Sequence, residues 1–260
     1  MKYADITVDD PNPVKRWLQR RRLADALVAI RGAQADSPLR VLDIGAGDGE
    51  LVLQMSRVVS IDAVIYEPTP SLMAQAREKL ADLDGVVFTD NLDSIVSGTC
   101  DYVFCLEVFE HLPRKETVAT IAQIERLLKP GGSAVIGVPH ELFMPALVKG
   151  VFRAWRRYGD YDANPGNVLL AMLGRPPHAR PVAEISPGLP YHFHHLGFDY
   201  RALERFLNRR LQLAKRWFSP FPGLGAVFNS EVYYLFGKPF GEPFGKPQRS
   251  GAAVAARAGE

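Results

Sequence analysis

The segment Val41-Leu42-Asp43-Ile44-Gly45-Ala46-Gly47-Asp48-Gly49-Glu50 runs from apolar residues directly into a turn that contains three glycines. The apolar residues predict a buried strand, and a helix is expected to begin after the turn. Glycines let the backbone turn sharply and let a ligand approach it without Cβ atoms in the way. The segment therefore predicts a ligand site at the carboxyl end of a strand in an α/β sheet.

Short apolar strands alternate with helical patterns on both sides of this segment. Strands that are apolar throughout and separated by helices predict a parallel sheet covered on both faces. The expected strands are 40–44, 63–66, 86–88, 102–106, 133–138, 211–216 and 231–236, and the last two are expected to pair antiparallel. The expected helices are 13–31, 50–57, 71–80, 117–128 and 200–208.

The alternation stops between residues 140 and 196. This stretch shows no clear strand, but it has two apolar helical patterns, at 145–158 and 167–173, and a Pro-rich link. It is too long for a plain connection, so we interpret it as a lid or substrate-binding insertion.

We expect one domain over residues 1–247. Its parts are an N-terminal helix (13–31), a cofactor-binding half (38–140), a helical insertion that forms the acceptor pocket (141–196) and the last strands (197–237). Three tandem tetrapeptides, FGKP, FGEP and FGKP, precede an Ala/Gly/Arg-rich end. Frequent proline and little apolar mass predict a disordered tail over residues 238–260.

Acidic residues follow the next two strands. Glu67 ends the strand after the glycine turn, where its carboxylate can accept both hydroxyls of a ribose. Asp90 follows the third strand, where a carboxylate can bind an adenine amino group, and Asn91 beside it completes the predicted set. Alone, Glu67 would be read as a surface acid and Asp90 as part of an ordinary loop; their spacing from the glycine turn makes them candidates.

These motifs resemble those of class I S-adenosylmethionine-dependent methyltransferases, especially the small-molecule group called type 11. DIGAGDG (43–49) looks like the first motif of that family, DYVFCLEVFEHL (101–112) resembles the fourth, and LLKPGGSAVIGVP (127–139) is similar to the entry into strand five. The resemblance implies a doubly wound, seven-stranded, mostly parallel sheet with an antiparallel last strand and a helical insertion between strands 5 and 6. It also implies S-adenosylmethionine as the cofactor, with its methionine part held by Asp43 and the Gly45, Ala46 and Gly47 backbone, and its amino group facing Leu106.

The alternative for the glycine turn is a nicotinamide or flavin enzyme. The dinucleotide fingerprint requires Gly-x-Gly-x-x-Gly, because a pyrophosphate sits on the helix N-terminus. Here the third glycine, Gly49, comes one residue early, and Asp43 and Asp48 would repel a pyrophosphate. A sulfonium with a zwitterionic amino-acid tail suits this acidic turn better.

Three histidines are candidate bases: His111, His192 and His194. His111 closes the fourth motif and would either accept a proton or cap the helix that Pro113 introduces. On an extended segment His192 and His194 would share a face, and His195 would point away. We expect no metal, because no cysteine or carboxylate stands at a convincing ligand spacing. A base, a substrate contact and a hydrogen-bonded loop remain open for these histidines.

The helical pattern at 145–158 is amphipathic and basic. Its apolar stripe is Leu147, Val148, Val151, Phe152 and Trp155, and its flanking cations are Lys149, Arg153, Arg156 and Arg157. Such a helix rests on an anionic membrane surface or binds an anionic amphiphile. The alternative, which we favour, is a lid whose apolar face packs on its own domain.

Composition narrows the function further. The chain is 47% apolar and 23% charged, without a run long enough for a membrane span or an N-terminal apolar core typical of a signal peptide. Residues 41–141 hold 7 Lys/Arg against 16 Asp/Glu, which is unlike a nucleic-acid-binding surface. We therefore expect a cytoplasmic protein, with peripheral contact at the inner membrane surface left open. Its predicted reaction is methyl transfer to a small-molecule, lipid or lipid-linked sugar acceptor; the alternative is a cofactor-binding scaffold or sensor without catalysis.

Overall fold

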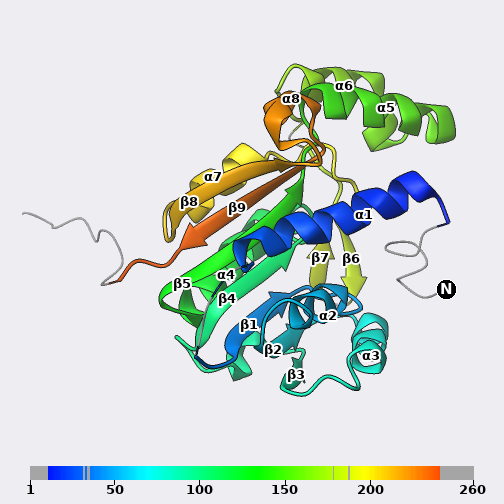
Figure 1. The fold of residues 1–260 in the computed structure, drawn as a ribbon. Helices are drawn as coiled ribbons and strands as arrows, with labels where there is room; N and C mark the ends of the chain where they lie inside the picture. Colours follow the sequence, from blue (N-terminus) through cyan, green and yellow to red (C-terminus); the bar gives the residue numbers. More distant parts are fainter. Residues whose placement is uncertain (1–10, 32, 34–35, 178, 187, 241–260) are drawn as a thin grey trace, which may run out of the picture.

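A computed structural model describes residues 11–31, 33, 36–177, 179–186 and 188–240. Its centre is a seven-stranded sheet in the order β3-β2-β1-β4-β5-β9-β8 (Figure 1). Strand β1 carries the glycine turn and pairs in parallel with β2 on one side and β4 on the other. The strands are β1 (Leu39–Ile44), β2 (Ile61–Tyr66), β3 (Val86–Thr89), β4 (Cys100–Leu106), β5 (Leu128–Pro139), β8 (Gln212–Ser219) and β9 (Glu231–Gly237).

The only antiparallel strand of this sheet, among the residues described, is β9. It runs antiparallel to both of its neighbours, β5 and β8, which are therefore parallel to each other. The predicted antiparallel pairing of the last two strands is confirmed. So is the predicted seven-stranded, mostly parallel sheet.

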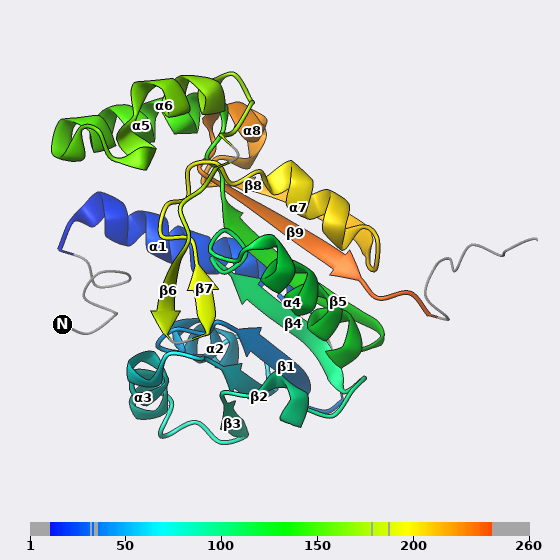
Figure 2. The same ribbon diagram turned by 180° about the vertical axis from the view of Figure 1, so that it is seen from behind.

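Helices cover both faces of the sheet, as the apolar strands require. On one face, buried side chains of α1, α2 and α3 pack on β1 and β2; on the other, α4 and α7 pack on β4, β5 and β9 (Figures 1 and 2). These helices are α1 (Pro13–Ala26), α2 (Glu50–Ser56), α3 (Pro70–Lys79), α4 (Arg114–Leu127) and α7 (Tyr200–Leu207).

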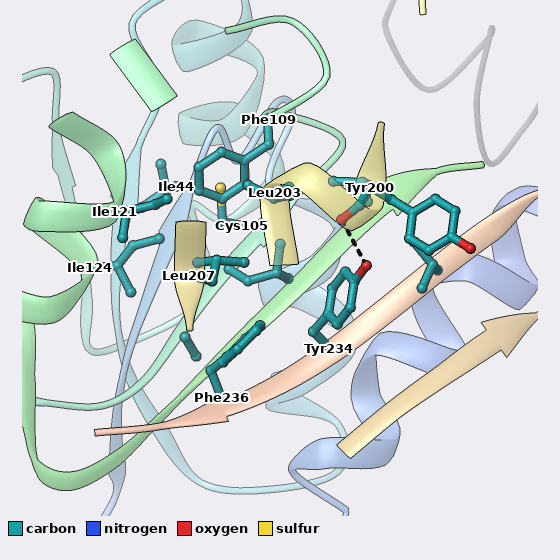
Figure 3. Close-up of a cluster of buried hydrophobic side chains, with 14 of the residues drawn as sticks. Ile44, Cys105, Phe109, Ile121, Ile124, Tyr200, Leu203, Leu207, Tyr234 and Phe236 are labelled. Atoms are coloured by element: carbon teal, nitrogen blue, oxygen red, sulfur yellow. Dashed lines mark hydrogen bonds between the residues drawn. The ribbon is translucent and has the colours of Figure 1, made fainter. Parts of the chain in front are cut away.

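The core beneath α4 and α7 joins the two halves of the chain. Ile121 and Ile124 come from α4, Leu203 and Leu207 from α7, and all lie near Phe236 of β9 (Figure 3). The hydroxyl of the neighbouring Tyr234 donates a 3.1 Å hydrogen bond to the carbonyl oxygen of Tyr200. A buried tyrosine needs such a partner, and this bond ties α7 to β9.

The insertion contains two helices and a β-hairpin. Helices α5 (Phe143–Arg157) and α6 (Pro165–Met172) correspond to the predicted helical patterns, and the short helix α8 (Gly225–Phe228) lies beside α5. The prediction of no strand in this stretch is wrong, because β6 (Ala183–Ser186) and β7 (Leu189–Tyr191) pair antiparallel. Gly188 between them adopts φ +79°, as a tight hairpin turn requires. Strands this short are below the length at which residue alternation is visible.

The chain remains attached to the sheet just beyond β9. The Lys238 amide donates to Gly132 O (2.8 Å), the Gly131 amide donates to Lys238 O (2.9 Å), and Lys238 Nζ donates to Leu128 O (2.7 Å). The predicted disordered tail is therefore wrong at its first residue. The rest of that prediction, from residue 241 on, lies outside the described residues.

Candidate active site

The glycine turn lies where β1 ends between its two parallel neighbours. Gly45 and Ala46 donate backbone hydrogen bonds to Tyr66 O at the end of β2 (2.8 and 3.2 Å). Gly45 has φ +74°, and a Cβ added there would lie 2.4 Å from Val108 Cγ2. The turn thus needs glycine both for its backbone conformation and for the close approach of the segment after β4.

A pocket opens at this point. Its walls include five residues predicted to bind the cofactor: Asp43, Gly45, Ala46, Gly47 and Leu106. Helix α1 crosses this edge of the sheet (Figure 1) and adds Gln19, Arg22 and Leu23 to the walls. The sequence predicts helix α1 but does not indicate that this helix lines the pocket.

Asp43 lies at the base of the pocket, with 2% of its surface exposed. Its Oδ2 has no hydrogen-bond partner among the residues that the structure describes. Burial, with a smaller contribution from the charge of Glu67, raises the pKa of Asp43 to about 7. A cationic group in the pocket would stabilise the ionised form of this carboxylate.

Glu67 does not line the pocket, although it lies close to the turn. Its carboxylate accepts hydrogen bonds from the backbone amides of Gly47 (2.9 Å) and Thr69 (2.8 Å), and it is 5% exposed. Here Glu67 holds the glycine turn in position. Its contact with ribose hydroxyls stays a prediction.

Asp90 and Asn91 are both exposed and lie outside the pocket walls. Asn91 Oδ1 accepts the Asp93 amide (2.9 Å) and so caps the short turn that follows β3. This is a local structural role that the sequence reasoning missed. Contact of either residue with adenine stays a prediction.

Asp48 shares a lysine with a second acid. Lys79 Nζ lies 2.5 Å from Asp48 Oδ2 and 2.8 Å from Glu50 Oε2. One cation between two carboxylates reduces the repulsion of a pyrophosphate but leaves a net negative charge. Asp43 and the early third glycine also disfavour a dinucleotide.

A buried ion-pair network contributes Arg22 and Glu107 to the pocket lining. Arg22 of α1 pairs with Glu231 of β9 and, at 3.4 Å, with Glu107. Burial alone would lower the pKa of Arg22, but the charges of Glu107 and Glu231 raise it. Glu107 also has φ +56°, a strained conformation for a residue other than glycine, and such strain is concentrated at functional sites. Arg22, Glu107 and Tyr233 are pocket residues that no local sequence motif indicated.

The hairpin docks on His111, just beyond the end of β4. His111 Nδ1 is 2.7 Å from His192 O, the His192 amide donates to His111 O (2.8 Å), and Tyr191 stacks on the His111 ring at 4.3 Å. Because a carbonyl only accepts, the His111 proton is on Nδ1 and Nε2 carries a lone pair. His195, expected to point away, instead meets the His111 ring edge-on at 4.7 Å.

The side chains of the other two candidate bases contact other groups. His192 Nδ1 contacts Pro181 O (2.8 Å), and His194 Nδ1 lies 3.4 Å from Asp162 Oδ1. His192 therefore meets His111 through its backbone, and its ring and that of His194 have partners of their own. Whether any of them acts as a base stays a prediction.

Comparison with known proteins decides the family. Residues 15–209 match the profile of a family described as a methyltransferase domain.

The chain belongs to this methyltransferase family.

Individual relatives agree with that assignment. The ubiquinone biosynthesis O-methyltransferase of Xanthomonas oryzae pv. oryzae is 36% identical over 98 residues, which are 36% of this chain and 40% of that protein. The 27-O-demethylrifamycin SV methyltransferase of Amycolatopsis mediterranei is 30% identical over 122 residues, 45% of this chain and 43% of that protein. The matches thus span about two fifths of the length of these curated relatives.

Solved structures show the same fold at low sequence identity. The PH0226 protein of Pyrococcus horikoshii superposes with a TM-score of 0.56 at 13% identity, covering 91% of this chain and 96% of its own. The N-methyltransferase NodS of Bradyrhizobium japonicum gives 0.53 at 14% identity, covering 88% and 90%. The predicted class I methyltransferase fold and S-adenosylmethionine as its cofactor are confirmed.

The pocket of this methyltransferase chain fits that cofactor chemically. Asp43 Oδ2 has no hydrogen-bond partner among the described residues, and a sulfonium or an ammonium group would supply a positive charge there. The backbone of Gly45, Ala46 and Gly47 lines the same pocket. Arg22 lines it as well, where it is paired with Glu107 and Glu231.

Two of the four cations on α5 are held by a buried acid. Glu141, 1% exposed, accepts Lys149 Nζ (2.9 Å) and Arg153 Nη1 (3.0 Å). Burial alone would raise the pKa of Glu141, but these cations lower it to about 2. Arg153 also reaches Asp162 at 3.2 Å. The membrane alternative has all four cations beside the stripe facing an external anion, and this is wrong for Lys149 and Arg153.

The apolar stripe of α5 faces outward. Val148, Val151, Phe152 and Trp155 are 54–84% exposed. The favoured alternative, a lid that packs this face on its own domain, is wrong for these four residues. Helices α5, α6 and α8 lie together at one end of the molecule (Figure 1). The residues of α6 and α8 and those next to them also include exposed apolar side chains: Leu169, Leu170, Leu173, Leu224, Val227 and Phe228.

Proposed function

We propose that this protein transfers a methyl group from S-adenosylmethionine to a hydroxyl of a small, largely apolar acceptor. The observation that carries the proposal is the pocket that Asp43, the glycine turn and Arg22 all line, in which the buried Asp43 Oδ2 has no hydrogen-bond partner among the described residues. A ligand with a cationic centre and an amino-acid tail matches these charges.

The residues of the pocket bind and orient. Asp43 would stabilise positive charge on the methionine part, and Arg22 would pair with its carboxylate. The cofactor, when bound, supplies a methyl group already activated by the sulfonium. The chain therefore has mainly to align the acceptor with this methyl group and to exclude water from the pocket. Helix α1, which lines the pocket, would help to exclude water.

The acceptor would enter beside the hairpin. Leu106 and Glu107 line the pocket, and His111 follows them by a few residues. Tyr191 stacks on His111, and Phe193 meets Tyr191 at 4.9 Å, so aromatic rings form this wall. Aromatic walls favour an acceptor with an apolar body. The lone pair on His111 Nε2 lies at the edge where a hydroxyl would be held.

The names of the relatives favour oxygen as the atom that is methylated. The Xanthomonas and Amycolatopsis relatives are both named for transfer to oxygen, and their matches cover 36–45% of this chain. This supports a hydroxyl acceptor over an amine or carbon. It does not name the acceptor.

A labelled-methyl screen tests this function. The protein is incubated with deuteromethyl-labelled S-adenosylmethionine and a cell extract, and products are separated into organic and aqueous phases before mass spectrometry. We expect a labelled O-methyl product in the organic phase that is absent with Asp43→Ala. Label on nitrogen or carbon would refute the hydroxyl acceptor. Cofactor binding without any labelled product would favour a scaffold or sensor.

We propose in addition that the α5–α6–α8 surface contacts anionic membrane. Trp155 is 84% exposed, and Arg156 lies over the ring of the exposed Phe152 at 5.7 Å. Aromatic side chains flanked by arginine are typical of helices that lie in the membrane interface. Among the residues described, no helix has the length and apolarity to span the bilayer. Surface contact would bring the site to a lipid-soluble acceptor.

Vesicle sedimentation tests the membrane contact. We expect binding to anionic but not to neutral vesicles, weakened by added salt because screening shortens the reach of charges. Replacing both Phe152 and Trp155 by serine should abolish binding. Val87→Ser serves as the matched control, since Val87 is 60% exposed on β3, far from α5 in the fold. If wild type ignores anionic vesicles at low salt, the surface has another role.

A further inference from the structure

Three potential metal ligands converge beside the end of β4. Glu110, His111 and His195 each offer one ligand atom, and these atoms all lie within 4.8 Å of one another. Two of them, His111 Nε2 and Glu110 Oε1, are 3.7 Å apart. His195 comes from the segment after the hairpin, so the fold and not a local motif assembles the group. This explains why ligand spacing in the sequence gave no indication of a metal.

Glu110 is the member of this group that most needs a partner. It is fully buried, and neither carboxylate oxygen has a hydrogen-bond partner among the residues described. Burial and the charge of Glu107 raise its pKa well above the ordinary value. A buried carboxyl group of this kind costs free energy unless an ion or a donor satisfies it.

One ring nitrogen of His111 is available to a metal ion. His111 donates its Nδ1 proton to His192 O, which leaves the Nε2 lone pair free of the hairpin backbone. A second hydrogen bond of this kind fixes the tautomer of metal-bound histidines in general.

A catalytic pair, in which Glu110 orients His111 as a general base, fits the geometry less well. In such a pair the carboxylate would accept the imidazole proton and orient the ring. Here that proton goes to His192 O, and 3.7 Å is too long for a hydrogen bond. Glu110 therefore does not orient His111 as a base, and a shared cation explains both side chains.

We propose that Glu110, His111 and His195 bind one divalent first-row transition-metal ion and leave coordination positions open. One carboxylate and two imidazoles suit Zn²⁺, Co²⁺, Mn²⁺ or Fe²⁺, whereas Mg²⁺ and Ca²⁺ prefer oxygen ligands alone. Bonds of about 2.1 Å in a tetrahedral centre place ligand atoms about 3.4 Å apart. The pair at 3.7 Å needs little movement, and rotation of the side chains closes the wider spacing.

Charges of both signs surround the group. Arg180 donates to the carbonyl oxygens of Glu110 (2.5 Å) and His194 (2.6 Å), and Lys149 and Arg153 also act on His195. Glu107 and Glu231 act on Glu110 more strongly than Arg22 does, and Glu141 opposes the cations at His195. The site lies at the same edge of the sheet as the cofactor pocket. A role of the ion in holding the acceptor hydroxyl rests on the proposed function; its binding does not.

Cobalt titration of the full chain tests the site. The protein is stripped with a chelator and titrated with Co²⁺, and the visible absorption of the bound ion is followed. We expect one equivalent of Co²⁺ to bind, to be displaced by Zn²⁺ and to be unaffected by equal Mg²⁺. Glu110→Gln and His195→Gln should each weaken binding more than about a hundredfold. This is a larger loss of affinity than removal of a group that only hydrogen-bonds to a ligand causes. His192→Gln, a neighbour outside the group, should bind Co²⁺ like wild type.

Binding of S-adenosylmethionine, measured by calorimetry, shows that the variants are folded. Glu110→Gln places a neutral amide where the acid is buried, so its melting temperature without metal should not fall. Absence of Co²⁺ binding in wild type, or unchanged affinity in both ligand variants, would overturn the site. If Co²⁺ binds as expected but no methyl product forms in the labelled screen, the proposed function fails and the metal site stands.

Discussion

Glu141→Gln is expected to destabilise the protein strongly, because Glu141 holds α5 to the body of the insertion. The carboxylate is 1% exposed and accepts hydrogen bonds from both Lys149 and Arg153. Glutamine keeps the shape but removes the charge. Two cations then lose their common partner, and Arg153, which is largely buried, keeps only Asp162.

The size of the effect follows from the Glu141 pKa, which falls from 4.5 to about 2. That change corresponds to about 3 kcal/mol of interaction in the folded state. Removal of one partner from a buried ion pair costs about 3–5 kcal/mol in general, so the two figures agree. Because the folded-state pKa is lowered, this stability is complete above about pH 4.5 and is lost as the pH falls toward 2.

Urea unfolding measures the loss at pH 7 and at several lower pH values. The control is Glu125→Gln, since Glu125 pairs with Arg210 at the surface, where the arginine side chain is 45% exposed. We expect a loss of about 3 kcal/mol for Glu141→Gln and below about 1 kcal/mol for the control. The difference between wild type and Glu141→Gln should shrink below pH 4.5. A loss no larger than the control, or one that does not depend on pH, would refute the reasoning.

Three further predictions concern the core and the pocket. Asp43→Asn should raise the melting temperature of the ligand-free protein at pH 8 but not at pH 4, because the raised Asp43 pKa means that ionisation costs stability as the pH rises toward 7. Tyr234→Phe should lower the free energy of unfolding by about 1 kcal/mol in urea, since it leaves the buried Tyr200 carbonyl without its donor. Arg22→Met should lower the free energy of unfolding more at pH 9 than at pH 7, because burial raises the pKa of Glu231 to about 8 and its carboxylate is charged and without its cation above that value; an unchanged urea midpoint at pH 9 would contradict this pairing.

The parts of the fold that sequence reasoning predicted correctly are those fixed by local chemistry. The Val41–Glu50 segment combines a strand, a turn that needs glycine and a helix start within ten residues, so neighbouring residues alone determine it. The hairpin at 183–191 was missed because its strands have three and four residues and gain their stability from docking on His111.

The parts of the site that were missed depend on contacts between distant residues. Arg22 looks like any basic residue of an amphipathic helix until β9 brings Glu231 to it. Likewise, Glu110 and His195 are far apart in the chain and meet only because the hairpin folds back over the end of β4. The sequence does not show that two of the α5 cations have an internal partner, because Glu141, which binds them, precedes the helix and is buried.

Calorimetric titration with S-adenosylmethionine and with NAD tests most directly whether the pocket beneath α1 is the cofactor site. We predict that wild type binds S-adenosylmethionine at micromolar concentration and does not bind NAD, and that Asp43→Ala loses the binding. Asp82→Ala, which changes an exposed acid outside the pocket walls, should bind like wild type. Binding of NAD, or undiminished S-adenosylmethionine binding by Asp43→Ala, would contradict the account.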